Sequence, residues 1–363
     1  MRYLEEKDID YIAIGAAILG AGGGGDPYIG KLMAKQAIKK HGKVKLLSVN
    51  EIDDNGLFIP SAMMGAPAVM VEKLPNGNEP EMAFRSLEKY LGKKAHAVLP
   101  IEAGGINSCI PIYTAATLSL PLVDADGMGR AFPELPMVTF SVAGLSATPM
   151  VVCDEKGNKL VLETINNAWS EILARNATIA MGLSSMISIY CLNGINVKKY
   201  AVKGTISLAL ELGKRITESN KSDNDPIESI LEISKGFKLF KGKIIDVKRD
   251  LTTGFVRGKV TIQGIENDTG SSFEIDFQNE NLIASKNGKP VAITPDLITV
   301  LDKEKGFPIT TEALKYGQRV TVIGMPCDPF WRTEAAINQV GPRYFKYDLD
   351  YKPIEELVKE NLS

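Results

Sequence analysis

Apolar residues recur at helical spacing from the start of the chain. These positions are Ile9, Ile12, Ala13, Ala16 and Leu19. Because they follow Asp8, the pattern predicts a first helix that this aspartate caps. Four consecutive glycines, Gly22 to Gly25, interrupt the pattern. Asp26 and Pro27 then predict the start of a second helix that runs to about Lys40.

Short apolar runs and helical patterns alternate further along the chain. The predicted strands cover residues 43–49, 57–61, 68–72, 95–101 and 122–123, and the predicted helices cover 79–91 and 109–119. Such alternation indicates an α/β domain with a largely parallel or mixed sheet. We assign residues 1–176 to this domain. In such sheets, ligands bind beyond the carboxyl ends of the strands.

The second part of the chain has a different pattern. A strand is still expected at residues 138–142, whereas periodicity leaves residues 178–190 open between a buried strand and a tightly packed helix. From residue 237 to 323, apolar and polar positions alternate between Asn- and Gly-containing turns, which predicts an antiparallel sheet or small barrel. We assign residues 177–363 to a β-rich α+β C-terminal domain.

Composition excludes several classes of function. The 363 residues carry a formal net charge of −2, which favours neither nucleic acid nor an anionic membrane as partner. The four cysteines are scattered, as is typical of reduced thiols, so we expect a cytoplasmic protein. With two histidines in the chain, a Ser-His-Asp triad or a His-rich zinc site is hard to build. The sequence shows no apolar leader and no membrane-spanning run.

The glycine loop has the spacing G-x-G-x-x-G, but it does not fit a dinucleotide site. Such a site needs a strand before the loop and an acidic residue about 20 positions later, and the sequence offers a helix and no acid at 36–49. Bare amides beside a helix N-terminus instead predict contact with a polar ligand. The predicted contact residues are Gly22, Gly23, Gly24, Gly25 and Asp26. A tight turn between packed helices is the alternative.

Two more loops combine acids with glycines after predicted strands. The first contains Glu102, Gly104, Gly105 and Asn107, and the second contains Asp124, Asp126 and Arg130. Glycine lets a backbone approach a ligand closely, while charged side chains orient it. Three such loops predict one shared pocket for a small molecule. Loop solvation and helix capping are the alternative for the aspartates.

Together these motifs resemble the S-methyl thiohydantoin desulfurase family. The matching stretches are Gly20–Pro27, Gly65-Ala66-Pro67, Glu102-x-Gly-Gly-x-Asn107, Val123–Glu134 and Phe330-Trp-Arg-Thr333 before Gly341-Pro342. Lys346 departs from the glycine expected there, and residues 177–234 match no motif. The resemblance implies an α/β domain joined to a β-rich domain, a homo-oligomer, and hydrolysis of a heterocyclic ring that releases methanethiol and leaves hydantoin.

The implied reaction assigns roles to these residues. A carboxylate takes a proton from water, and Glu102 or Asp126 is the expected general base. Asn107 and Arg130 are expected to orient the ring, and the glycine amides to stabilise developing charge. No cofactor is predicted. One alternative is a Mg²⁺ or Mn²⁺ site made by Glu102, Asp124 and Asp126, with or without a nucleotide. Another is a non-catalytic subunit of a hydantoinase or oxoprolinase complex.

Overall fold

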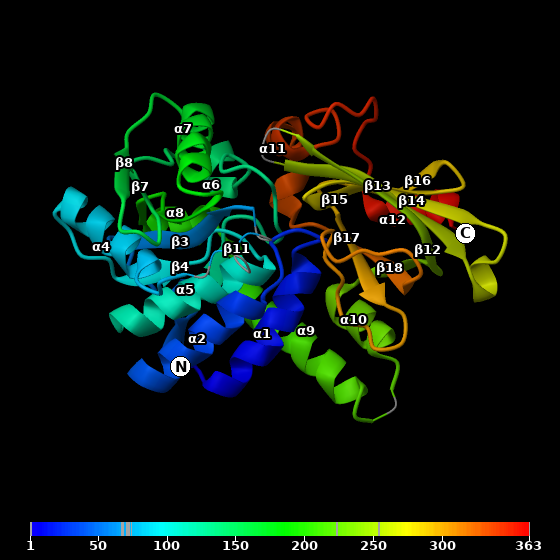
Figure 1. The fold of residues 1–363 in the computed structure, drawn as a ribbon, viewed down its shortest axis with the longest axis horizontal. Helices are drawn as coiled ribbons and strands as arrows, with labels where there is room; N and C mark the ends of the chain where they lie inside the picture. The colour runs from blue at the N-terminus through cyan, green and yellow to red at the C-terminus, as the bar shows by residue number, and fades with distance from the viewer. Residues whose placement is uncertain are drawn as a thin grey trace.

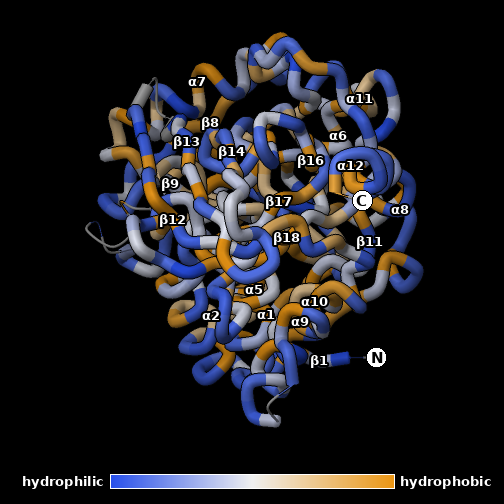
Figure 2. Tube along the Cα trace, turned by 90° about the vertical axis from the view of Figure 1, so that its right-hand side faces the viewer, coloured by the Kyte–Doolittle hydropathy of each residue, from blue (hydrophilic) through white to orange (hydrophobic). Residues whose placement is uncertain are grey.

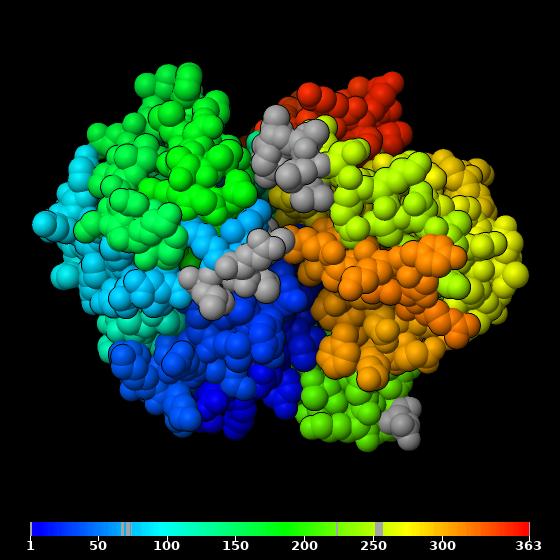
Figure 3. Space-filling view, in the orientation of Figure 1, coloured from blue at the N-terminus to red at the C-terminus, as the bar shows by residue number. Residues whose placement is uncertain are grey.

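The chain forms two halves that lie side by side (Figure 1). The computed structural model describes residues 2–66, 69, 73, 75–222, 224–252 and 255–362. The N-terminal half mixes helices and strands, whereas the C-terminal half is mainly sheet. The two halves meet along a seam that crosses the face shown in Figure 3. The predicted fold class, an α/β part followed by a β-rich part, is confirmed.

The N-terminal half is built on a mixed sheet of nine strands. They are β1 (Arg2–Leu4), β2 (Val44–Leu47), β3 (Leu57–Gly65), β4 (Ala97–Leu99), β5 (Leu122–Val123), β7 (Met150–Cys153), β8 (Lys159–Leu162), β9 (Ser184–Ser188) and β10 (Leu192–Asn193). The order is β1-β2-β5-β4-β3-β9-β7-β8, and β10 pairs with β3. The neighbours β2, β5, β4 and β3 are parallel, and the other pairs are antiparallel.

Helices cover this sheet and extend toward the second half. They are α1 (Glu6–Leu19), α2 (Tyr28–His41), α4 (Glu79–Leu91), α5 (Gly105–Leu118), α6 (Thr139–Val142), α7 (Asn167–Ala180), α8 (Gly194–Tyr200), α9 (Thr205–Ser219) and α10 (Pro226–Ser234). Helices α1 and α9 pack backbone to backbone, because a Cβ on Gly15 would lie 1.8 Å from the Ala209 carbonyl oxygen. Helices α9 and α10 lie below β17 and β18 in the ribbon of Figure 1 and in the tube of Figure 2.

The C-terminal half is one antiparallel sheet of seven strands. They are β12 (Phe237–Thr252), β13 (Phe255–Gly264), β14 (Ser272–Gln278), β15 (Glu280–Lys286), β16 (Lys289–Ile293), β17 (Leu297–Asp302) and β18 (Arg319–Met325). The order is β16-β15-β14-β13-β12-β18-β17, and contacts between β15 and β17 show that the sheet curls. Helices α11 (Glu334–Val340) and α12 (Ile354–Asn361) follow, and α12 packs on β16. The predicted antiparallel sheet is confirmed.

Several helices and strands predicted from the sequence differ in the structure. The strand predicted at residues 138–142 is wrong, because α6 occupies Thr139–Val142 and the Val142 N–H donates to the Val138 carbonyl rather than to a neighbouring strand. A run this short does not distinguish strand from helix by periodicity. Residues 178–190 hold both candidates, since α7 ends at Ala180 and β9 begins at Ser184. Apart from Val69, the strand predicted at residues 68–72 lies outside the described residues.

The glycine loop connects the two halves. The Ala21 carbonyl accepts from the Asn281 N–H at 2.8 Å, and the Gly22 carbonyl accepts from the Thr311 N–H at 2.8 Å. Both donors belong to the C-terminal half. Farther along the seam, the Trp331 Nε1–H donates to the Met128 carbonyl at 2.6 Å. The segments nearest the seam are therefore hydrogen-bonded to both halves.

Candidate functional site

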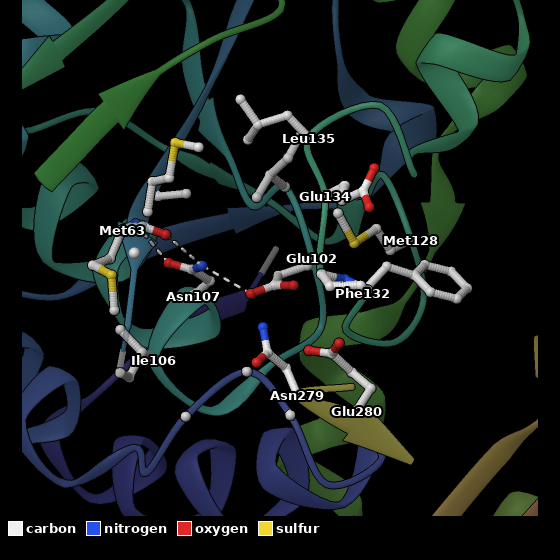
Figure 4. A pocket seen from close by; sticks show the side chains of 18 of the residues that line it. Met63, Glu102, Ile106, Asn107, Met128, Phe132, Glu134, Leu135, Asn279 and Glu280 are labelled. Carbon is white, nitrogen blue, oxygen red and sulfur yellow. Dashed lines mark hydrogen bonds between the residues drawn. The ribbon is translucent and has the colours of Figure 1, made fainter. Parts of the chain in front are cut away.

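A pocket opens at the seam, with an empty volume of about 850 Å³ that includes its mouth. Figure 4 shows it from close by. From the N-terminal half, its walls include the glycine loop, the end of β3, the loop before α5, the first turn of α5 and residues 128–135. From the C-terminal half, they include the turn into β15. The lining residues are Gly22–Gly25, Ala62–Gly65, Ile101, Glu102, Ile106, Asn107, Met128, Phe132–Leu135, Arg175, Ile187, Asn279, Glu280, Thr311 and Glu312.

Glu102 lies in the centre of this pocket. It follows β4, where the chain turns into α5, so the fold places it beyond the carboxyl end of a parallel strand as predicted. The side chain is buried, and burial raises the pKa of Glu102 to about 7. Hydrogen bonds from Asn107 and from the Phe132 backbone act in the opposite direction. A carboxyl group with such a pKa exchanges protons near neutral pH.

Asn107 fixes the position of Glu102. Its Nδ2 donates to Glu102 Oε1 at 2.8 Å and to the Met63 carbonyl at 3.0 Å, and its Oδ1 accepts from the Met63 N–H at 2.7 Å. Helix α5 begins at Gly105, earlier than predicted, because extended Gly104 serves as its N-cap. That start places Asn107 in the first turn, beside β3.

Glu280 faces the same space from the C-terminal half (Figure 4). It is the first residue of β15 and is 3% exposed. Burial, and then the charge of Glu102, raise the pKa of Glu280 to about 8, opposed by Arg130 and by backbone amides that include Gly24. Its Oε2 is buried and has no hydrogen-bond partner among the described residues. The site therefore holds a second acid that the sequence analysis missed.

The glycine loop lines the pocket and is packed tightly against both halves. Gly24 has a φ of +70°, and a Cβ there would lie 2.6 Å from the Gly104 Cα. A Cβ on Gly23 would lie 2.0 Å from Glu280 Oε1, and one on Gly105 would lie 2.2 Å from the Gly25 carbonyl oxygen. The glycines are thus needed because side chains would displace Glu280 and the start of α5.

Asp26 lies outside the pocket lining. It is exposed, and its Oδ1 accepts from the Tyr28 N–H at 2.8 Å. Pro27 is the N-cap and α2 begins at Tyr28, so the predicted helix start is one residue early. The aspartate still fixes the turn into the helix, by an Asx-type bond rather than as the cap residue.

The third predicted loop reaches the pocket with Met128 and not with its charged side chains. Asp124 accepts from the Ser207 N–H at 2.9 Å and from its hydroxyl at 2.6 Å. Asp126 is fully buried and accepts from the Gly129 N–H at 2.9 Å; burial raises its pKa well above the usual value. Neither aspartate lines the pocket.

Arg130 bridges the two halves. Its Nη1 donates to the carbonyl groups of Pro295 at 2.7 Å and Asp296 at 2.9 Å. The guanidinium carbon lies 4.5 Å from the centre of the Phe132 ring, and the side chain is fully buried. Phe132 lines the pocket and Arg130 does not. Arg130 is thus placed to hold the pocket wall against the C-terminal half.

The remaining wall is largely apolar, with charges at its edge. Met63, Ile106 and Leu135 form one side of the space around Glu102 (Figure 4). Glu134 accepts from the Tyr344 hydroxyl at 2.6 Å, and burial raises the pKa of Glu134. Arg175 is paired with Glu171 of the same helix. The pocket therefore combines an apolar side with a carboxyl pair.

Within the parts of the chain that the structure describes, no group of three or more His, Cys, Asp and Glu side chains is arranged to hold a metal ion. The described helices include none with the length and apolar character needed to span a membrane.

Two family models together match residues 7–354 of the chain. Residues 7–164 match the family described as S-Me-THD-like, N-terminal domain, and residues 165–354 match S-Me-THD-like, C-terminal domain. A search of the curated proteins found no match. The fold is similar to the X-ray crystal structure of a protein from Chromobacterium violaceum, with 23% identity and a TM-score of 0.83, over 98% of this chain and 100% of that chain. At this identity, the likeness shows a shared fold.

Proposed function

This chain belongs to the S-Me-THD-like family, and on that premise we propose that it is a hydrolase acting on an S-methyl thiohydantoin-like ring. The products are methanethiol and a hydantoin. The observation that carries the proposal is the pair Glu102 and Glu280, two buried carboxyl groups that face one pocket. Their pKa values, about 7 and about 8, allow one to be ionised while the other is protonated.

The reaction needs one ionised and one protonated carboxyl group. Glu102, with the lower pKa, accepts a proton from water as the water oxygen bonds to the ring carbon that carries sulfur. Glu280, still protonated, donates its proton to the adjacent ring nitrogen. The adduct then collapses: its hydroxyl proton passes to Glu280, the carbonyl forms, the C–S bond breaks, and Glu102 protonates the sulfur. In net, nitrogen and sulfur each gain one proton, and both carboxyl groups return to their starting states.

Other pocket residues position the reactants. Asn107 holds Glu102 through the 2.8 Å bond, so its carboxyl group is already oriented before substrate enters. The apolar side formed by Met63, Ile106 and Leu135 suits a methylthio group. Asp126 and Arg130 have no direct role in this scheme, because neither lines the pocket.

Substitution of each acid tests the proposal. E102Q keeps the shape of the side chain but removes the base, so we expect turnover, measured as methanethiol release, to fall roughly 10²–10⁴-fold. E280Q should give a comparable loss. The matched control is E88Q, which removes a buried carboxyl group that pairs with Arg85 and Lys94 away from the pocket. Unchanged turnover in folded E102Q would contradict the proposal.

Two alternatives lead to different results. If a carboxylate-bound metal supplied the nucleophile, EDTA would abolish turnover and Mg²⁺ or Mn²⁺ would restore it; we expect EDTA to leave turnover unchanged. If the chain were a binding subunit of a hydantoinase or oxoprolinase complex, the purified chain alone would release no methanethiol.

Homo-oligomer formation and a cytoplasmic location remain predictions, which light scattering and cell fractionation can test.

A further inference from the structure

We call the part of the pocket formed by Glu102, Asn107 and Glu280 its floor. This floor presents carboxyl oxygens to the cavity. Both hydrogens of the Asn107 amide are engaged, one by the Met63 carbonyl and one by Glu102 Oε1. Glu280 Oε2, although buried, has no partner among the described residues. A buried carboxyl group without a partner is costly, and an unprotonated ligand nitrogen that accepts from its protonated form would satisfy it.

The charges around the floor favour the same kind of ligand. Among the described lining residues, the single cationic one is Arg175, which is ion-paired with Glu171. Arg130 lies outside the lining and donates to backbone carbonyl groups. Glu102 and Glu280 thus face the pocket from opposite halves, and the charge of Arg130 reaches Glu280 from behind the wall. A ligand N–H group would give the ionised carboxylate a donor inside the pocket.

We propose that this floor recognises the N–C–N edge of a cyclic isothiourea or cyclic guanidine, in which an N–H group donates to Glu102 and the unprotonated ring nitrogen accepts from protonated Glu280. The inference rests on the proposed function, because the thiohydantoin-like substrate is a cyclic isothiourea. It extends the ligand class to 2-aminoimidazol-4-ones, in which an amino group replaces the methylthio group. In hydantoin both nitrogens beside that carbon carry hydrogen, so neither accepts the hydrogen bond from protonated Glu280.

Separate titrations of two matched ligands test this assignment. Creatinine, an N-methylated 2-aminoimidazol-4-one, and hydantoin are titrated separately into the wild type, E280Q and the control E88Q by calorimetry near neutral pH. We expect creatinine to bind the wild type and E88Q at least about tenfold more tightly than hydantoin, as charge-assisted hydrogen bonds imply. In E280Q the ratio should fall to within about threefold.

Each other outcome is decisive. Equal or tighter binding of hydantoin, failure of both ligands to bind, or a full preference retained in folded E280Q would overturn the inference. Methanethiol release is measured on the same samples, which separates the two proposals. Release without a preference for creatinine would overturn the inference alone, whereas a preference without release would overturn the proposed reaction and leave the ligand class standing.

Discussion

At Glu102 and Glu280, burial outweighs hydrogen bonding in setting the protonation state. Glu102 accepts hydrogen bonds from Asn107 and from the Phe132 backbone, and both favour its ionised form. Desolvation is nevertheless the larger effect, so the pKa rises. For Glu280 the charge of Glu102 adds to desolvation. With pKa values of about 7 and about 8, the pair holds one proton between these two values.

This coupling predicts a bell-shaped pH dependence of kcat/KM. Below a pH of about 7 Glu102 is protonated and cannot act as base, and above about 8 Glu280 has lost the proton that it donates. We expect the maximum between these two values. Initial rates of methanethiol release across the pH range check the prediction. A single acidic limb near the ordinary carboxyl pKa would show that neither buried acid controls the reaction.

Among elements, the glycine loop is the one that contacts both the start of α5 and the C-terminal half. Its carbonyl groups bond to residues of α5 and of the C-terminal half, including Ile106 to Gly24 at 2.9 Å and Thr311 to Gly22 at 2.8 Å. Its missing side chains leave room for Glu280 and Gly104. The tight-turn and ligand-lining interpretations of this loop are thus compatible, since one face packs while the other lines the pocket.

Gly24→Ala tests the packing part of that role, with Gly92→Ala as matched control. Both glycines have a left-handed φ, +70° and +64°, but a Cβ on Gly92 would meet nothing within 4 Å. We expect G92A to lower the free energy of unfolding by about 1 kcal/mol without changing turnover. G24A should lower it further and reduce turnover more than about tenfold, because Gly104 must move.

Urea unfolding and methanethiol release measure the two effects. Equal losses of stability in G24A and G92A would mean that the glycine loop accommodates a methyl group at position 24 without displacing Gly104. In that case the close approach of Gly24 to Gly104 would have no functional consequence.

The pocket acids differ in how far the sequence could predict them. Glu102 and Asn107 follow a parallel strand and open a helix, so local pattern and the strand-end rule indicate them together. Glu280 sits in the polar run Gln278–Asn281 between alternating strands, which is typical of a hairpin turn. Its approach to Glu102 depends on how two halves dock. No local pattern encodes that contact.

The role of Arg130, which the sequence predicted to orient the substrate, also depends on contacts between the two halves that no local pattern encodes. Its loop is rich in acids and glycines, and a charged residue there is compatible with a ligand contact or with a structural one. The structure shows that its N–H groups meet carbonyl oxygens of Pro295 and Asp296 across the seam. Distinguishing the two roles requires the position of the C-terminal sheet.

At the scale of the whole molecule, the site depends on the seam. Each half contributes one acid, and neither half alone encloses the pocket. Contacts across the seam come from the glycine loop, from Arg130 and from Trp331, which donates to the Met128 carbonyl beside the pocket. Loosening any of these would change the separation of Glu102 and Glu280 before it unfolded either sheet.

Arg130→Ala and Arg130→Lys distinguish a structural from a substrate-binding role. The alanine variant leaves the buried carbonyl groups of Pro295 and Asp296 without their donor, at about 1–3 kcal/mol for each unsatisfied group. We expect the free energy of unfolding in urea to fall by about 2 kcal/mol or more in R130A. Lysine keeps the charge but cannot bond both carbonyls and stack on Phe132, so R130K should recover part of that loss. If Arg130 instead bound substrate, R130K would raise KM strongly while unfolding at the wild-type urea concentration.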